Sequence, residues 1–250
     1  MTRRITETLD QVCIDPRAGP DTLDRMADEC VELGVAAFCV YPWWVERVAK
    51  RMGDRVATSG IVSMPIGLEG TAAKVAATKD CVASGATEID FLAAWSAILY
   101  GDLDAAIRDA AAVVEAAKSE NPDVITKAII ESPEMEQIPG KLDDACRVVV
   151  ESGADFAKTS TGLSIYGGGT VQQVKAMRAA LPDHVEVKAA SPDILTLADA
   201  IAMVEAGSTR LGTPVPIQIA LEEAGRLDDP RIGAASSGYV REFGWTSPTA

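Results

Sequence analysis

Short runs of apolar and β-branched residues alternate along the whole chain with longer stretches in which apolar residues recur at helical spacing. The apolar runs predict eight strands, at residues 11–14, 35–41, 55–62, 88–93, 124–130, 155–159, 185–189 and 209–212. The stretches between them predict helices, among them residues 103–118 with Asp102 as N-cap and residues 171–180 with Thr170 as N-cap. The predicted order is therefore strand and helix in alternation along the whole chain.

Strands that alternate with helices pair in parallel, and a continuous apolar run such as residues 35–40 suits a strand that is buried on both faces. Eight such units close most naturally into a TIM (β/α)8 barrel, whose usual length is about 250 residues. The chain has 250 residues and no linker-like shift in composition. We therefore expect one α/β barrel domain over residues 1–250, with a mobile tail at residues 241–250. An open doubly wound sheet is the alternative fold.

Composition narrows the possible partners and chemistry. The net charge is −14, and lysine and arginine form no stripe interleaved with aromatic residues, so nucleic acid is not an expected partner. No apolar run reaches the roughly 18 residues of a membrane helix, and no export signal is visible, so a membrane is not an expected partner and the cytoplasm is the expected location. Five cysteines without a C-x-x-C pair fit reduced thiols better than disulfides, the single histidine cannot build a histidine-rich metal site, and no nucleotide-binding motif is present.

Four successive predicted strands each carry one ionisable residue in an otherwise apolar run. These residues are Asp90, Lys127, Lys158 and Lys188. Removing water from a charge is costly, so aspartate and lysine are rarely buried without a partner. In a barrel the four side chains would converge toward the carboxyl ends of the strands, where TIM barrels carry their active sites. A single such lysine is explained equally well by an extended side chain or a structural ion pair, whereas four on successive strands favour a catalytic site.

The charges of this set point to a particular chemistry. Three lysines face Asp90, or Asp90 together with Asp15, so positive charge is in excess. Neighbouring like charges lower the pKa of a lysine, and a neutral lysine is a nucleophile toward carbonyl groups. The set therefore predicts Schiff-base formation on one lysine, with an aspartate and a second lysine available for proton transfer.

The sequence resembles the deoxyribose-phosphate aldolases, which are class I aldolases built on a TIM barrel, over nearly its whole length. The most specific match is GADFAKTSTG at residues 153–162, which is similar to the family's Schiff-base motif almost letter for letter. Further matches lie at residues 14–15, 39–42, 65–67, 85–90, 127–131 and 207–213. The resemblance implies reversible joining of acetaldehyde to glyceraldehyde 3-phosphate without a metal or an organic cofactor.

The resemblance also implies roles for individual residues. Lys158 would form the Schiff base, Lys188 would lower the pKa of Lys158, and Asp90 would move protons through a water molecule. Lys127 would support Asp90, and Asp15 would lie nearby. The candidates for substrate binding are Cys39, Thr159, Ser160, Thr161, Gly162, Gly212 and Thr213.

The segments expected to bind phosphate depart from the family pattern. The family's Gly-Gly-Ile-Arg loop is replaced by ASPDIL at residues 190–195, which is one residue longer and has leucine in the arginine position. The family's Gly-Thr-Ser-Ser turn is replaced by GTPVP at residues 212–216. A phosphate cradle consists of backbone N–H donors, which proline lacks. The residues that oppose such a cradle are Pro192, Asp193, Leu195, Pro214 and Pro216.

We therefore expect a class I aldolase, a lyase of carbohydrate metabolism that acts on small aldehydes or sugars with an unphosphorylated or atypical acceptor. The alternatives are an ordinary deoxyribose-phosphate aldolase and a Schiff-base isomerase or dehydratase on the same barrel. A binding protein without activity is disfavoured, because every proposed catalytic position is retained. A homodimer is the expected assembly. Trp43, Trp44 and Trp95 are candidates for lining an apolar acceptor pocket.

Overall fold

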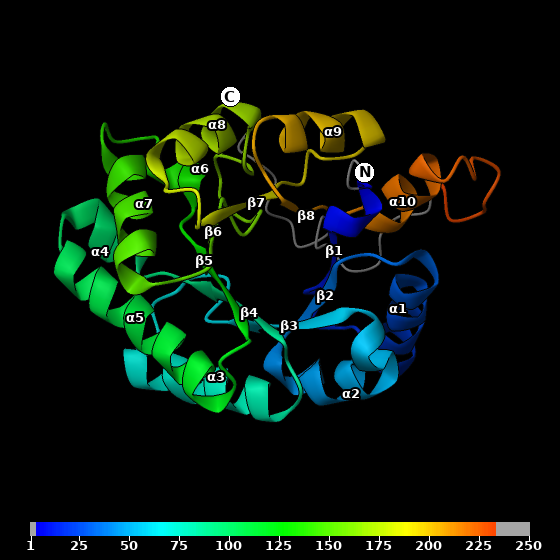
Figure 1. Cartoon of the computed structure of the whole chain (residues 1–250), viewed down its shortest axis with the longest axis horizontal. Coiled ribbons are helices and arrows are strands. Elements are labelled where there is room, and N and C mark those ends of the chain that lie inside the picture. Colours follow the sequence, from blue (N-terminus) through cyan, green and yellow to red (C-terminus); the bar gives the residue numbers. More distant parts are fainter. Residues whose placement is uncertain (1–3, 234–250) are drawn as a thin grey trace.

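The strands form a sheet that closes on itself. In the computed structural model, which describes residues 4–233, eight parallel strands pair in chain order and the last pairs back onto the first. Figure 1 shows the strands at the centre with the helices around them. The fold is the predicted (β/α)8 barrel, and the open doubly wound sheet is excluded. The tail expected at residues 241–250 lies outside the described residues.

All eight strands lie within two residues of their predicted bounds. They are β1 (Leu9–Cys13), β2 (Ala37–Val40), β3 (Ala57–Val62), β4 (Glu88–Leu92), β5 (Ile125–Ile129), β6 (Phe156–Lys158), β7 (Glu186–Ala190) and β8 (Arg210–Gly212). The difference that matters is at β1, which begins two residues earlier than predicted and so includes Asp10.

Helices follow the strands and cover the outside of the barrel. Those of the described residues are α1 (Pro20–Leu33), α2 (Pro42–Met52), α3 (Thr71–Ala83), α4 (Trp95–Tyr100), α5 (Leu103–Glu120), α6 (Ser132–Met135), α7 (Lys141–Ser152), α8 (Val171–Ala180), α9 (Leu197–Glu205) and α10 (Pro216–Glu223). Asp102 accepts a hydrogen bond from the backbone N–H of Ala105 and so caps α5, and Thr170 forms a capping box with Gln173 at α8. Both predicted N-caps are confirmed. Within residues 4–233, no helix combines the length and the apolar character needed to cross a bilayer.

The alternation of side chains along each strand divides the interior into two layers. In β4, Ile89 and Phe91 belong to the large apolar cluster between strands and helices, whereas Glu88 and Asp90 point into the barrel. A second, smaller apolar cluster lies near the carboxyl ends of β1 to β5, and we call it the mouth cluster. Its buried members are Ile14, Cys39, Ile61, Met64, Leu92 and Ile129.

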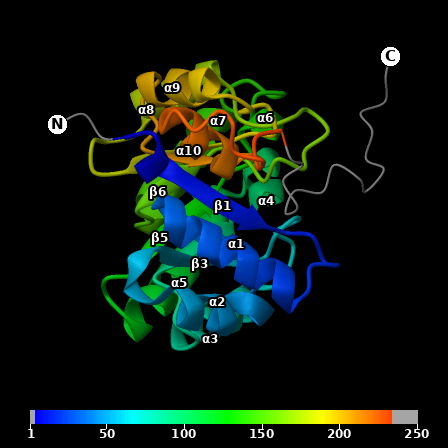
Figure 2. The ribbon, with the colours of Figure 1, turned by 90° about the vertical axis from the view of Figure 1, so that its right-hand side faces the viewer.

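The first and last described elements are joined by one carboxylate. Glu223, at the end of α10, accepts hydrogen bonds from the backbone N–H groups of Ile5 and Thr6 at 2.6 and 2.8 Å, and from the Thr6 hydroxyl at 2.6 Å. Figure 2 shows α10 beside β1, against which it packs. This contact holds β1 in place next to β8, which fixes the position of Asp10 inside the barrel.

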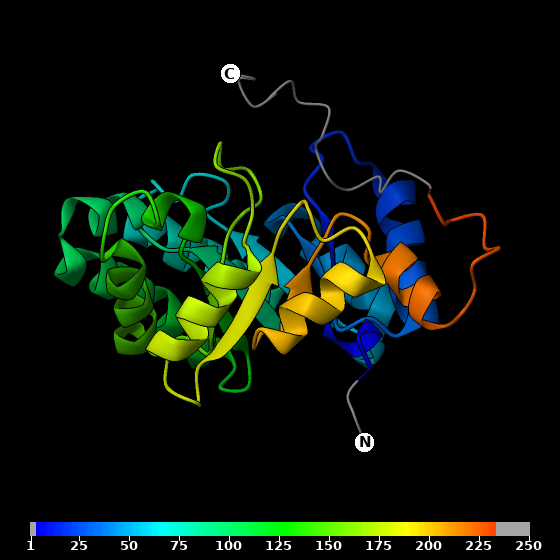
Figure 3. The same ribbon diagram turned by 90° about the horizontal axis from the view of Figure 1, so that it is seen from above.

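All eight strands point the same way, so the loops after them share one end of the barrel. Figure 3 shows the arrow of β7 directed toward the side from which the loop between β6 and α8 extends. This loop, residues 159–170, directly follows Lys158. The predicted site residues of several strands therefore meet at this end, which we call the barrel mouth.

Candidate active site

Charged side chains fill the barrel below its mouth. Six of them form a closed ring in which acids and bases alternate, and we call this set the ion ring. Its members, in order of contact, are Asp10, Lys188, Asp90, Lys127, Glu88 and Arg210, which contacts Asp10 again. All six are buried. Three bases balance three acids, so the ion ring as a whole carries no net charge.

The contacts around the ion ring are short and well paired. Asp90 Oδ2 lies 2.6 Å from Lys188 Nζ, and Asp90 Oδ1 lies 2.8 Å from Lys127 Nζ. The Arg210 guanidinium lies 2.7 Å from each of the two carboxylates that flank it. Because the partners come from strands β1, β4, β5, β7 and β8, the ion ring also links opposite walls of the barrel.

Lys158 is an additional positive charge attached to the ion ring. Its Nζ lies 2.8 Å from Asp90 Oδ2, the same oxygen that binds Lys188. The hydroxyl of Ser59 donates to Asp90 Oδ1 at 2.9 Å. Asp90 therefore contacts three ammonium groups and one hydroxyl. Lys158 thus has no carboxylate of its own, and it is 5% exposed, whereas the two other lysines that contact Asp90 are fully buried.

These contacts shift the pKa values of the lysines in opposite directions. Burial lowers the pKa of Lys158, and the charge of Lys188 lowers it further, while Asp90 compensates only in part. Burial acts on Lys127 and Lys188 as well, but the two carboxylates that contact each of them outweigh it and raise their pKa values. For Asp90, burial is outweighed by the three lysine charges, which hold its pKa well below the usual value. Of the three lysines that contact Asp90, Lys158 is therefore the one whose pKa is lowered.

Asp15 is not part of this set, contrary to the expectation from the sequence. Because β1 ends at Cys13, Asp15 lies in the turn that follows, where it accepts hydrogen bonds from the backbone and the side chain of Arg17. The side-chain hydrogen bond lowers the pKa of Asp15. The carboxylate that β1 contributes is Asp10. Burial would raise the pKa of Asp10, but the adjacent cations of the ion ring lower it to about 2.

Asp10, Glu88 and Arg210 were not among the predicted site residues. Glu88 stands two residues before Asp90, and residues at this spacing share one face of a strand, so the pattern contained a usable signal. Arg210 is another ionisable residue inside a predicted strand. Asp10 was missed because it precedes the first predicted strand by one residue.

The four residues after Lys158 were predicted to bind substrate: Thr159, Ser160, Thr161 and Gly162. The hydroxyls of Thr159 and Ser160 both donate to the carbonyl of Ala190 on β7, at 3.2 and 2.7 Å. The backbone N–H of Thr161 donates to the carboxylate of Glu131, and Gly162 has a φ of 78°, which favours glycine. This segment is therefore held by the ends of the two neighbouring strands.

The other predicted binding residues come from β2 and from the end of β8. Cys39 is buried inside the barrel with Sγ 3.6 Å from Lys188 Nζ, and burial raises the pKa of its thiol to about 11. At Gly212 a Cβ atom would lie 3.2 Å from a side chain of β7, so glycine permits the close approach of β7 and β8. The hydroxyl of Thr213 donates to the carbonyl of Ile194 and so fixes the loop after β7.

The half of the mouth that β1 to β5 form is apolar. The mouth cluster adjoins the site, because its member Ile129 is the register neighbour of Lys158. Trp95 packs against this cluster. Trp43 is 84% exposed on α2, and Trp44 packs with the large outer cluster. Of the three tryptophans considered for an acceptor pocket, only Trp95 packs against the mouth cluster.

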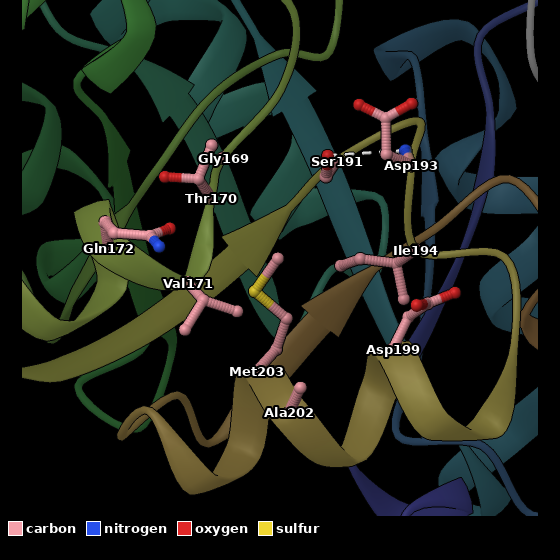
Figure 4. Close-up of a pocket in the computed structure, with 10 residues that line it drawn as sticks. All are labelled: Gly169, Thr170, Val171, Gln172, Ser191, Asp193, Ile194, Asp199, Ala202 and Met203. Atoms are coloured by element: carbon pink, nitrogen blue, oxygen red, sulfur yellow. Dashed lines mark hydrogen bonds between the residues drawn. The ribbon is translucent and has the colours of Figure 1, made fainter.

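A crevice of about 440 Å³ lies between the start of α8, the loop after β7 and one side of α9 (Figure 4). Apolar side chains, among them Val171 and Met203, form part of its wall. The described residues that line it include the carboxylates Asp193 and Asp199 and no lysine or arginine. The loops after β6 and β7 are in close contact beside it, since a Cβ atom on Gly168 would lie 2.4 Å from a side-chain atom of the β7 loop.

The site contains the groups that imine chemistry requires. A buried lysine with a lowered pKa is a nucleophile, an adjacent carboxylate can exchange protons, and a second lysine stays charged. In the part of the chain that the structure describes, no three His, Cys, Asp or Glu side chains are arranged to hold a metal ion.

Comparisons with known proteins show the family to which the chain belongs. A family model described as DeoC/LacD family aldolase matches residues 10–209. The deoxyribose-phosphate aldolase of Brevibacillus brevis is 36% identical over 215 residues, which cover 84% of this chain and 92% of the relative. The enzyme of that name from Carboxydothermus hydrogenoformans is 34% identical over 220 residues, 86% of this chain and 93% of the relative.

Solved structures show the same likeness. An aldolase designated QR15 has a TM-score of 0.82 at 29% identity, with 89% of this chain and 96% of that chain covered. The deoxyribose phosphate aldolase of Aeropyrum pernix, described as a unique tetrameric structure, has a TM-score of 0.78 at 25% identity, with 89% and 92% covered.

The family match and the named relatives, together with the closed (β/α)8 barrel, show that the protein is a class I aldolase and therefore a lyase. More narrowly, the chain belongs to the DeoC/LacD family of aldolases.

The role of Asp10 as the carboxylate that β1 contributes to the ion ring can be tested by measuring the free energy of unfolding. Asp10→Asn should lower the free energy of unfolding by about 3–5 kcal/mol, because it removes one of the two carboxylates that contact each of Lys188 and Arg210 and leaves a net positive charge buried in the ion ring. Asp15→Asn is the matched control and should cost less than about 1 kcal/mol, because it disrupts only an exposed pair. Urea unfolding at pH 7 measures both. Equal, small losses would show that the ion ring does not depend on Asp10.

Proposed function

We propose that the protein is a Schiff-base aldolase in which Lys158 is the nucleophile and the acceptor aldehyde carries no phosphate group. The first part depends on one observation, that Lys158 shares its counter-ion with two other ammonium groups. Since burial and Lys188 lower the pKa of Lys158, more of its amine is neutral near pH 7 than in an ordinary lysine. A neutral amine adds to an aldehyde.

In the proposed reaction, the neutral Lys158 Nζ adds to the carbonyl of the donor aldehyde, and uptake of a proton from water followed by loss of a water molecule gives a protonated imine. Removal of a proton from the neighbouring carbon gives an enamine, which forms the new carbon–carbon bond with the acceptor carbonyl. Asp90 takes up this proton through a water molecule and returns it to the acceptor oxygen, and hydrolysis of the resulting imine releases the product and free Lys158. In the enamine the nitrogen of Lys158 is neutral, so Asp90 has lost one of its three cations and its pKa rises. Lys188 remains charged throughout, because two carboxylates contact it.

The second part of the proposal is supported by the loop between β7 and α9. The backbone N–H groups of Leu195 and Thr196 donate to Asp199 Oδ2 at 3.1 and 2.9 Å, and that of Leu197 donates to Glu222 Oε2 at 2.8 Å. These donors at the start of α9 are therefore already satisfied by carboxylates. A phosphate brought to them would have to displace one carboxylate and would be repelled by both.

Three successive residues of the turn after β8 offer no free N–H group. Pro214 and Pro216 have no N–H group, and the N–H of Val215 donates to the hydroxyl of Thr213 at 3.1 Å. The negative charge of Asp193 beside the neighbouring loop adds to the repulsion. Together with the apolar mouth cluster, these features favour an acceptor aldehyde without a phosphate group.

The proposed homodimer stays a prediction, and the tetramer described for the Aeropyrum pernix relative gives it no direct support. An ordinary deoxyribose-phosphate aldolase, the activity for which the Brevibacillus and Carboxydothermus relatives are named, is the second candidate function. The two candidate functions differ in whether the acceptor carries phosphate, and a comparison of phosphorylated and unphosphorylated substrates distinguishes them.

The nucleophile is tested by trapping. Incubation with acetaldehyde and sodium borohydride should add an ethyl group to the peptide that contains Lys158, and Lys158→Leu should abolish the label. Asp90→Asn keeps the shape of the side chain but removes a base, so labelling should persist while turnover falls by about 100-fold or more. Peptide mass spectrometry locates the label. Label confined to Lys127 or Lys188 would contradict the assignment, and equal loss of labelling and turnover in Asp90→Asn would make Asp90 structural.

The acceptor is tested by comparing kcat/KM for cleavage of deoxyribose 5-phosphate with that of deoxyribose. Each charge-assisted hydrogen bond to phosphate contributes about 1.5–3 kcal/mol, so a site without two or three of them should discriminate at least about 100-fold less than a relative with an intact cradle. The Brevibacillus brevis enzyme provides the parallel measurement. A preference for the phosphorylated sugar equal to that of the relative would establish the second candidate function instead.

A further inference from the structure

Glu131 stands two residues after the end of β5 in a backbone conformation that few residues other than glycine adopt. Its φ and ψ are 50° and 57°, in the left-handed region, although it carries a full side chain. That side chain is only 4% exposed. A strained conformation of this kind persists where the surroundings enforce it, and such positions concentrate at functional sites.

The surroundings of this residue are the segment that begins with the proposed nucleophile. Both oxygens of the carboxylate lie 3.2 Å from the backbone nitrogen of Thr161. On either side, the N–H of Ile130 donates to the carbonyl of Lys158 at 3.0 Å, and the N–H of Ser132 donates to the carbonyl of Thr159 at 2.6 Å. Residues 130–132 therefore hold the main chain at residues 158, 159 and 161, and the carboxylate provides the last of these contacts.

The charge of this carboxylate changes within the physiological pH range. Burial raises the pKa of Glu131 to about 7, hydrogen bonds from Thr161 and the charge of Lys158 on β6 oppose the rise, and Glu134 on α6 adds to it. An ionised carboxylate accepts a stronger hydrogen bond from an N–H group than a protonated carboxyl does. The hydrogen bond from the N–H of Thr161 to the carboxylate of Glu131 should therefore strengthen as the pH increases through about 7.

We propose that Glu131 is a positioning residue of the aldolase site. Its carboxylate fixes the main chain at Thr161, and this keeps residues 159–162 in the conformation that binds substrate. The residue does not need to touch the reacting atoms, because it acts through the segment that follows Lys158. This inference depends on the proposed function for the identity of the site and is independent of whether the acceptor carries phosphate.

Glu131→Gln tests the inference, because glutamine keeps the length and an oxygen acceptor but cannot ionise and so resembles the protonated carboxyl. The probe is cleavage of 3-hydroxybutanal, with kcat and KM measured from pH 5.5 to 8.5. At pH 8.5 the variant should have a KM about tenfold higher than wild type, with kcat changed less than threefold. At pH 5.5 the two KM values should converge. A ratio of KM values that is constant across this range, or equal to one throughout, would overturn the inference.

Two further variants separate positioning from folding. Glu131→Gly suits the left-handed backbone and removes the carboxylate, so it should melt within a few degrees of wild type and show the raised KM at all pH values. Glu134→Gln, which neutralises the next carboxylate but keeps an oxygen that can accept from Ser164, should leave KM within about twofold. If both Glu131 variants fail to fold while Glu134→Gln folds, Glu131 serves the fold and the inference is wrong. Absence of borohydride trapping on Lys158 in the wild type would instead reject the proposed function.

Discussion

A buried charge requires a counter-charge, and this constraint organises the inside of the barrel. Asp90 contacts three ammonium groups, and two of them, those of Lys127 and Lys188, each have a second carboxylate from the ion ring. Lys158 has no second carboxylate among the contacts of the ring. The ion ring therefore keeps two lysines charged and leaves the third as the group that most easily loses its proton. The same contacts link five strands, so the chemistry and the closure of the barrel depend on the same side chains.

The two sides of the barrel mouth differ in polarity. On the β1 to β5 side it is apolar, and on the β6 to β8 side hydroxyls and backbone groups bond to one another rather than to solvent. The start of α9 is a place where backbone donors attract an anion. Here Asp199 and Glu222 already occupy those donors. These occupied donors are the basis of the proposal that the acceptor aldehyde carries no phosphate group.

Much of this could be predicted from the sequence, because apolar periodicity determines where strands and helices lie. The eight strands, the N-caps Asp102 and Thr170, and the convergence of Asp90, Lys127, Lys158 and Lys188 all followed from local pattern. The carboxylate from β1 did not, because an error of two residues at a strand start exchanged Asp10 for Asp15. Pairing across the barrel, as between Arg210 and Glu88, joins residues far apart in sequence, and periodicity carries no information about such partners. The backbone conformation of Glu131 could not be predicted either, since nothing in residues 127–131 marks a left-handed position.

The central claim is that the ion ring lowers the pKa of Lys158, and titration of that amine tests it most directly. In protein with ¹³C-labelled lysine side chains, the Cε signal that disappears in Lys158→Leu can be followed by NMR as the pH increases. The account predicts a midpoint below the ordinary lysine value of about 10.4, with Lys127 and Lys188 still charged at that pH. In Lys188→Leu the midpoint should move upward, because one cation no longer competes for Asp90. A midpoint at or above the ordinary value in the wild type, or one that Lys188→Leu leaves unchanged, would contradict the account.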